Sequence, residues 1–250
     1  MDFQGRAVAV TGAGSGMGER IAHRFAEQGA AVAAVDVDAD AATATAETIE
    51  AETPAEAVAI TADVSDADDV SGFIARTVEE FGSIDVLHNN AGIPQEATPV
   101  EEVTEATWDR IQDVNLKSAF LGAKYAVPRM REQGGGVILN TASTAGIRPR
   151  TGLSAYAASK GGMITLTKQL AFELADDDIR VNAICPVATD TGMLPQFAGD
   201  DLSVEGMAET IPLGRLAEPD DVADAAVFLA SENAQMITGT ALEVDGGRDI

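Results

Sequence analysis

The stretch RAVAVTGAGSGMGERIAHRFAEQGAAVAAVD, residues 6–36, decides the fold. An apolar, β-prone run at 6–11 leads into a glycine-rich turn at 12–18, and an amphipathic stretch follows at 17–29. A second apolar run at 31–36 ends on an aspartate. A strand, a glycine turn, a helix and another strand within about 30 residues predict a parallel βαβ unit.

The same alternation continues through the rest of the chain. We predict further strands at 57–64, 84–92, 134–143, 178–187 and 240–247, and helices at 41–53, 66–81, 104–132, 153–175 and 219–231. Pro128 is the expected site of a kink, and residues 188–213 are predicted to be irregular. The alternation predicts the α/β class, with one doubly wound, mostly parallel sheet of Rossmann type, helices on both faces and a single domain over residues 1–250.

The chain is strongly acidic. Its 250 residues carry 16 Lys and Arg against 41 Asp and Glu, which gives a formal charge of −25. Such a charge repels phosphates and anionic lipids, so nucleic acids and membranes are poor partners. Few lysines and many aspartates indicate a halophilic protein, because at 1 M salt the screening length falls to about 3 Å. We therefore expect folding to depend on salt.

Cysteine content and hydropathy indicate the compartment. Cys185 is the single cysteine, so no intramolecular disulfide can form. No apolar run approaches the roughly 20 residues of a membrane helix, and the acidic, glycine-bearing N-terminal stretch does not resemble a secretion signal. The expected location is the cytoplasm.

Polar clusters follow the predicted strands. They are Gly12–Gly18, Asp36, Asp63, Asn89–Gly92, Ser143 and Pro186–Thr191. Because the carboxyl ends of parallel strands meet at one edge of a sheet, these clusters are expected to form one ligand site there.

The first two clusters predict a dinucleotide site. Gly12, Gly16 and Gly18 permit a tight turn and let backbone amides approach a pyrophosphate at a helix N-terminus. Asp36 can accept hydrogen bonds from the ribose hydroxyls and would repel the 2′-phosphate of NADP. Ser15 and Val37 supply no cation for that phosphate, so we predict NAD as the cofactor. A plain tight turn with a solvated aspartate is the alternative interpretation.

A second pattern indicates proton transfer. Tyr156 and Lys160 are four residues apart in a predicted helix and share a face. An ammonium beside a phenol favours phenolate, so Lys160 is expected to lower the pKa of Tyr156 and make it a usable acid/base. Ser143 ends a predicted strand 13 residues upstream, where its hydroxyl could hold a substrate oxygen.

With these residues the chain resembles the short-chain dehydrogenases/reductases from end to end. The matching stretches are TGAGSGMG (11–18), Asp63-Val64, NNAG (89–92), Asn115 in DVNLKS, Ser143 in NTASTAG, YAASK (156–160), RVNAICP (180–186) and ALEVDGG (241–247).

The resemblance implies the site residues. It implies Tyr156 as acid/base, Lys160 as its partner on the nicotinamide ribose, Ser143 on the reacting oxygen, and Asn115 holding a water of the proton relay. The implied cofactor-binding residues are Gly12, Ser15, Gly16, Met17, Gly18, Asp36, Asp63, Val64, Asn90, Ala91, Gly92, Tyr156, Lys160, Pro186, Val187, Thr189 and Thr191. One position departs from the family, because Val187 stands where a glycine usually follows the proline. No metal is implied, since the hydride passes directly between substrate and nicotinamide.

The substrate end is less defined. Arg148 and Arg150 lie between Ser143 and Tyr156, where scarce cations could select a carboxylate or phosphate. The alternative is that they pair with carboxylates of this chain or of another subunit. By resemblance residues 188–213 form a substrate lid, and Met193 within it is a candidate substrate contact.

The sequence therefore predicts an NAD(H)-dependent oxidoreductase acting on a secondary alcohol or ketone, with a sugar acid or hydroxy acid as first guess. A 3-oxoacyl thioester reductase and a sugar or cyclic alcohol dehydrogenase remain open. So do an NAD-sensing binding protein and a lyase or epimerase on the same scaffold. The resemblance also implies a homotetramer, with the 153–175 helix and the last strand in the subunit contacts.

Overall fold

The strands of the protein are the apolar runs of its sequence. In the computed structural model, which describes residues 1–197 and 204–250, seven strands form one parallel sheet. They are β1 Ala7–Thr11, β2 Ala31–Asp36, β3 Ala57–Thr61, β4 Val86–Asn89, β5 Gly136–Thr141, β6 Ile179–Pro186 and β7 Ala241–Val244. Every residue of β1, β4 and β5 except Gly136 is buried, as expected for strands covered on both faces. The predicted α/β class is confirmed.

The order of the strands fixes where a ligand can bind. The sheet runs β3-β2-β1-β4-β5-β6-β7, so the chain first builds outward from β1 and then reverses direction at β4. Neighbouring strands diverge from such a reversal, which leaves a crevice at their carboxyl ends. The glycine turn after β1 opens into that crevice.

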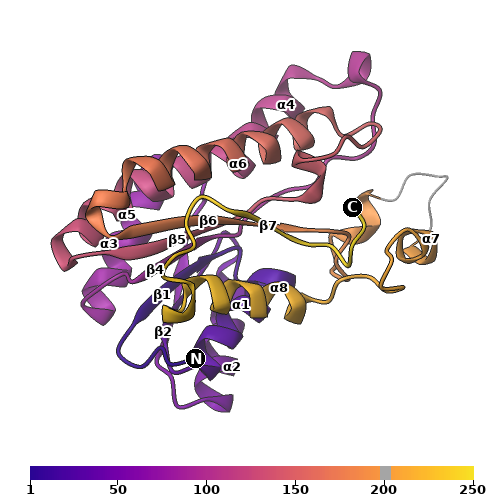
Figure 1. Ribbon diagram of the computed structural model, residues 1–250. Helices are drawn as coiled ribbons and strands as arrows, with labels where there is room; N and C mark the ends of the chain where they lie inside the picture. The colour runs from indigo at the N-terminus through magenta and orange to yellow at the C-terminus, as the bar shows by residue number, and fades with distance from the viewer. Residues whose placement is uncertain (198–203) are drawn as a thin grey trace.

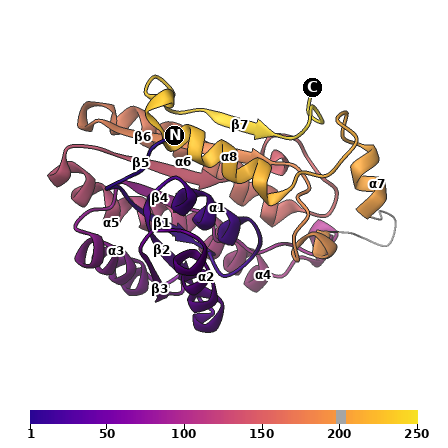
Figure 2. The ribbon, with the colours of Figure 1, turned by 90° about the horizontal axis from the view of Figure 1, so that it is seen from below.

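Helices cover both faces of the sheet (Figures 1 and 2). The helices are α1 Gly16–Glu27, α2 Ala39–Glu52, α3 Ala67–Phe81, α4 Glu105–Gln112, α5 Ser118–Gln133, α6 Ser154–Glu173, α7 Val204–Glu209 and α8 Pro219–Ala230. One face carries α1, α2 and α8, and the other carries α3, α4, α5 and α6 (Figure 1). Phe25 and Val222 are buried on the first face, and Phe73 and Met130 on the second. The sheet therefore lies between two apolar layers.

The long helix expected over 104–132 is interrupted. A π-helical turn, Asp113–Lys117, separates α4 from α5, and it contains Asn115. Pro128, the expected site of a kink, lies inside α5. A π turn inserts an extra residue into the helical register and is frequent at functional sites. Here it turns Asn115 inward.

The segment expected to be irregular contains some helix. Leu194–Phe197 forms a 3-10 turn and α7 follows, while residues 198–203 lie outside the described part of the chain. The α7 helix and the C-terminus lie toward the same end of the sheet (Figure 1). A search of the described residues finds no helix that is long and apolar enough to span a bilayer.

Candidate active site

A cleft of about 800 Å³ lies at the carboxyl ends of the strands. All of the cofactor-binding residues predicted from the sequence line it, and so do Ser143, Arg150 and Met193. Asn115 and Arg148 are not among its lining residues. Phe197 and Met207, from the expected lid, also line it. Sequence reasoning missed several other lining residues, of which the informative ones are Arg110, Thr141, Leu153 and Arg248.

The glycine turn is shaped for close approach of a ligand. Gly12 and Gly16 have φ of 68° and 58°, values that favour glycine. A Cβ on Gly18 would lie 1.9 Å from the carbonyl oxygen of Gly12, so the turn and α1 could not pack as they do with any other residue there. Because α1 begins at Gly16, its first N–H groups face the cleft, where a phosphate would bind.

Asp36, the predicted partner of the adenosine ribose, lies beside the glycine turn. Its Oδ2 accepts the Gly14 N–H at 2.8 Å and its Oδ1 accepts the Asp38 N–H at 3.0 Å. These bonds hold the carboxylate beside the glycine turn and leave lone pairs for ribose hydroxyls. Beside it, Val37 is exposed and uncharged, so these residues offer no partner for a 2′-phosphate.

Asp63 lies farther along the cleft, after β3. Its Oδ1 accepts the Ser65 N–H at 2.9 Å and the Ser65 hydroxyl at 2.6 Å, and these bonds lower the pKa of the carboxyl. Arg110 approaches from α4, with its Nη1 3.7 Å from Asp63 Oδ2. Asp63 is therefore ionised and fixed in orientation.

A buried hydrogen-bond network joins the ends of β1, β4 and β5. The Asn90 and Ala91 N–H groups donate to Thr11 Oγ1 at 3.0 and 3.1 Å, and Asn90 Oδ1 accepts from Thr141 Oγ1 at 3.2 Å. His88 Nε2 lies 2.9 Å from the same Thr141 hydroxyl. Burial lowers the pKa of His88 to about 3, so this histidine is neutral and serves the packing of the network.

The geometry brings Ser143, Tyr156 and Lys160 together. Ser143 hydrogen-bonds to the Tyr156 phenol, and Lys160 Nζ lies 5.7 Å from the centroid of the Tyr156 ring. Phe197 also packs against this ring in an edge contact, with the centroids 5.1 Å apart.

We expected Lys160 to lower the pKa of Tyr156, and this expectation is wrong in the structure. Burial raises the pKa of Tyr156 to about 12, and only the hydrogen bond from Ser143 acts in the opposite direction. The reason is the orientation of Lys160, whose ammonium donates to the Thr141 carbonyl at 2.7 Å rather than to the phenol. Lys160 is itself buried, which lowers its pKa to about 8.

Asn115 lies behind the cleft wall. Its Oδ1 accepts the Ile93 N–H at 2.7 Å and its Nδ2 donates to the Ile93 carbonyl at 2.9 Å. A Cβ on Gly92 would lie 3.4 Å from both Asn115 Oδ1 and Lys160 Nζ. The two side chains therefore flank Gly92, and glycine leaves space between them.

Val187 fits the backbone without strain. Its N–H donates to the Val244 carbonyl at 3.1 Å, and its buried side chain packs against Ile211 and Ala217. Asp178 is the one non-glycine residue of the described chain with positive φ, so position 187 does not need glycine for its conformation. The Thr189 hydroxyl donates to the Val187 carbonyl at 2.9 Å and fixes the following turn.

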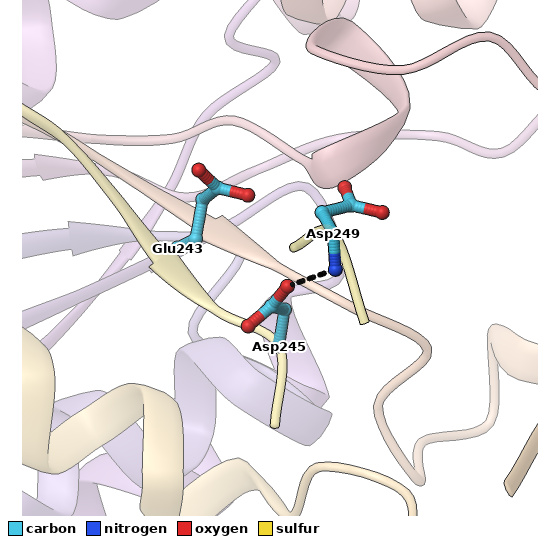
Figure 3. Close-up of side chains that lie close together, drawn as sticks. All are labelled: Glu243, Asp245 and Asp249. Carbon is cyan, nitrogen blue, oxygen red and sulfur yellow. Dashed lines mark hydrogen bonds between the residues drawn. The ribbon is translucent and has the colours of Figure 1, made fainter. Parts of the chain in front are cut away.

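Arginines and carboxylates meet where the predicted substrate contacts Arg148 and Arg150 lie. Arg150 Nη2 lies 3.2 Å from Asp249 Oδ1, and Arg148 Nε lies 3.9 Å from the same oxygen. Figure 3 shows Asp249 beside Asp245 and Glu243, whose ligand atoms lie within 4.8 Å of one another. The pKa of Arg248 is lowered by burial and by Arg150 and raised by Asp249 and Asp245. Asp249 therefore interacts with all three guanidinium groups, and Asp245 with that of Arg248.

Comparison with known proteins agrees with this geometry. The family model described as "Enoyl-(Acyl carrier protein) reductase" matches residues 12–249. The 4-formylbenzenesulfonate dehydrogenase TsaC1/TsaC2 of Comamonas testosteroni is 41% identical and covers 100% of both chains. The cis-4-hydroxycyclohexanecarboxylate dehydrogenase of Sinomonas cyclohexanicum is 39% identical over 98% of this chain and 97% of its own length.

A solved structure extends the comparison to three dimensions. The 3-ketoacyl-(acyl-carrier-protein) reductase of Brucella melitensis, complexed with NADH, superposes with a TM-score of 0.93 at 43% identity, covering 99% of each chain. The chain belongs to the short-chain dehydrogenases/reductases. It is an oxidoreductase that acts on alcohol and carbonyl groups with NAD(H) as cofactor.

Proposed function

We propose that the protein oxidises a secondary alcohol that carries an anionic group, of the sugar acid or hydroxy acid kind. The observation that supports this proposal is that Arg150 and Arg248 line the same cleft as Ser143 and Tyr156. Cations are scarce in this chain, so two guanidiniums beside the reacting groups form a selective site for a carboxylate or sulfonate. Two relatives have names that include a sulfonate or a carboxylate.

The proposed chemistry uses the residues that the cleft brings together. Bound NAD supplies the hydride acceptor. The Tyr156 phenolate takes the hydroxyl proton of the alcohol, and Ser143 donates a hydrogen bond to the same oxygen. Lys160 binds the nicotinamide ribose and, once it turns from Thr141, stabilises the phenolate. Asn115 holds a water at the far side of Lys160, which connects the proton path to solvent.

The remaining residues hold the cofactor in this proposal. The amides at the start of α1 hold the pyrophosphate, Asp36 the adenosine ribose, and Asp63 with Val64 the adenine. Residues 90–92 line the middle of the cleft. At the nicotinamide end Pro186, Val187, Thr189 and Thr191 receive the carboxamide, and Thr191 packs near Gly16, where a Cβ would lie 3.4 Å from its Cγ2.

The lid expected over residues 188–213 stays a proposal. Met193, Leu194, Phe197 and Met207 line the cleft from this segment and give it an apolar wall. Residues 198–203 of the expected lid lie outside the described part of the chain. We assign the substrate's carbon skeleton to the apolar wall and its anionic group to the arginines.

We further propose a cytoplasmic, salt-adapted homotetramer. Phe120 on α5 is half exposed and lies beside Leu116 and Leu166 in an apolar hollow at the outer surface of α5 and α6. A subunit contact through these helices would cover the hollow. Light scattering in molar KCl measures the mass, and a monomer there would contradict the proposal.

The test of the substrate class uses a matched pair of alcohols. NADH formation is followed with cis-4-hydroxycyclohexanecarboxylate and with 4-methylcyclohexanol, in molar KCl. We expect the carboxylate to be turned over with a lower KM than 4-methylcyclohexanol. In Arg248→Gln the KM for the carboxylate should rise, while the KM for 4-methylcyclohexanol should stay unchanged. Tyr156→Phe should bind NAD but lose turnover. Equal KM values for the two alcohols, unchanged in Arg248→Gln, would contradict an anion site.

A second candidate is a 3-oxoacyl thioester reductase, which the solved relative from Brucella melitensis favours. Asp36 argues against NADPH, the reductant usual for such enzymes. Consumption of NADH with acetoacetyl-CoA, without oxidation of any alcohol in the pair, would favour this candidate. Binding of NAD with no turnover in either direction would favour an NAD sensor, and turnover without net NADH would favour a lyase or epimerase.

A further inference from the structure

The helix that carries Tyr156 has no cap of its own. The residue before α6 is Leu153, whose side chain cannot accept a hydrogen bond, and the first intrahelical bond runs from the Ala157 N–H to the Leu153 carbonyl at 2.8 Å. The N–H groups of the first turn therefore need acceptors from elsewhere. Tyr156 is the third residue of that turn.

Gln95 supplies the acceptor for Tyr156. Its Oε1 accepts the Tyr156 N–H at 2.9 Å, across 61 residues of sequence, and its side chain is only 2% exposed. The following peptide group is also held, because the Tyr156 carbonyl accepts from the Ser159 hydroxyl at 2.7 Å. The backbone of the reacting tyrosine is thus fixed at both its donor and its acceptor.

The loop that carries Gln95 is itself fastened to the start of α6. The Thr98 N–H donates to the Gly152 carbonyl at 3.1 Å. Gly152 has φ of 76°, and a Cβ there would lie 2.8 Å from Thr98 N, so the two loops touch through their backbones. The same loop leaves β4 through residues 90–92, which line the cleft. It therefore connects the cofactor side of the cleft with the helix of the tyrosine.

The orientation of the Gln95 amide has a cost. Since Oε1 faces the Tyr156 N–H, Nε2 points the other way and is buried with no hydrogen-bond partner among the described residues. A buried donor without a partner is unfavourable and needs a reason. The need of the Tyr156 N–H for an acceptor is that reason.

We propose that Gln95 is a positioning residue for the reaction, which sets the location of Tyr156 relative to Ser143 by accepting the Tyr156 N–H. This inference rests on the acid/base role proposed for Tyr156. Gln95 caps α6 from the loop that follows β4, so the position of Tyr156 depends on the position of that loop. The short polar residues that usually cap a helix would act only locally.

The test compares Gln95→Leu with a matched control, Gln133→Leu. Gln133 makes the same kind of bond, accepting the Ile84 N–H at 3.2 Å, but it does so at the last residue of α5 and not at the start of α6. Gln95→Glu keeps an acceptor oxygen and should restore function, and Gln95→Asn is too short to reach. Should Gln95→Leu fail to fold, Gln95→Asn takes its place.

The first measurement needs no substrate. Hydrogen exchange of the Tyr156 amide should become about tenfold faster in Gln95→Leu and stay unchanged in Gln133→Leu and Gln95→Glu. Unchanged exchange in Gln95→Leu overturns the inference even where no alcohol is turned over. Absence of turnover in the wild type contradicts only the proposed substrate class.

The second measurement separates positioning from stability. With NAD and cis-4-hydroxycyclohexanecarboxylate, kcat of Gln95→Leu should fall about tenfold or more, because a small misplacement of a reacting group is costly. The KM for NAD should stay within about twofold of the wild-type value, and the pH midpoint of kcat should rise as the Ser143 bond to the phenol weakens. A kcat and a midpoint equal to those of Gln133→Leu, or no rescue by Gln95→Glu, would overturn the inference.

Discussion

Ser143→Ala should raise the pH at which alcohol oxidation begins. In the structure two effects act on the Tyr156 phenol in opposite directions: burial raises its pKa to about 12, and the Ser143 hydrogen bond lowers it. A hydrogen bond to a charged group is worth about 1.5–3 kcal/mol. Since one pKa unit corresponds to about 1.4 kcal/mol, loss of the bond should raise the pKa by about one to two units.

The sign follows from the form of the base. Oxidation needs the phenolate, so activity is present above the pKa of Tyr156 and is lost as the pH falls through it. A raised pKa therefore moves the rising limb of kcat to higher pH, by the same one to two units.

With NAD saturating and Lys160 turned to the phenolate as proposed, we expect the pKa of Tyr156 to fall below the value that burial gives it, so kcat is measured for the wild type, Ser143→Ala and Ser143→Thr between about pH 6 and 10. Ser143→Thr keeps the hydroxyl and should keep the wild-type midpoint. Ser143 is also proposed to bind the substrate oxygen, so kcat should fall at every pH in Ser143→Ala. A fall by one constant factor with no change of midpoint would refute the link between Ser143 and the phenol.

Three further predictions concern the cofactor and the surface. Asp36→Ala should lower kcat/KM with NAD, because it removes the acceptor for the ribose hydroxyls. It should also raise the ratio of kcat/KM with NADP to that with NAD by about tenfold or more, because it removes the charge that repels a 2′-phosphate. An unchanged ratio in steady-state kinetics would contradict this prediction. Gly18→Ala should destabilise the fold by about 1–3 kcal/mol and weaken NAD binding, since its Cβ would lie 1.9 Å from the Gly12 carbonyl oxygen; calorimetry and NAD titration measure both. Raising KCl from about 0.1 to 2 M should raise the unfolding temperature by about 10 °C, because the repulsion that comes from the net charge of −25 is then screened. The same unfolding temperature at both concentrations would show that salt adaptation is absent.

The fold could be predicted because its signals are local and repeated. The glycine turn after residues 6–11 and the apolar runs that follow need no long-range information, and each predicted strand has its counterpart in the sheet. Residues on different strands could be assigned to one cleft because all pairs in the sheet are parallel, which places every carboxyl end at one edge. The break at Asp113–Lys117 escaped prediction, because the stretch DVNLK contains no glycine or proline that would mark an interruption of the helix.

The pKa values of the site could not be predicted from the sequence in the same way. The spacing of Tyr156 and Lys160 fixes their common face but not the rotamer of the lysine. Lys160 reaches the Thr141 carbonyl on β5, and this contact is set by how α6 packs on the sheet. The predicted shift of the tyrosine pKa therefore had the wrong direction for the chain by itself, although the pair was identified correctly as neighbours in space.

The substrate end shows where local reasoning stops. Arg150 and Asp249 are 99 residues apart in sequence and meet because β7 lies beside β6 at the edge of the sheet. Asp249 is almost fully buried, so its pairing with Arg150 is held by the fold and not by chance contact at the surface. An anionic substrate of the proposed kind would have to compete with Asp249 for Arg150, whereas the pKa of Arg248 is lowered by burial and by Arg150. Asp249 and Asp245 act on Arg248 in the opposite direction. Arg148 and Arg150 both pair with Asp249, whereas no ion pair of Arg248 is found among the described residues, so we expect Arg248, and not the arginines noticed first in the sequence, to bind the proposed anion.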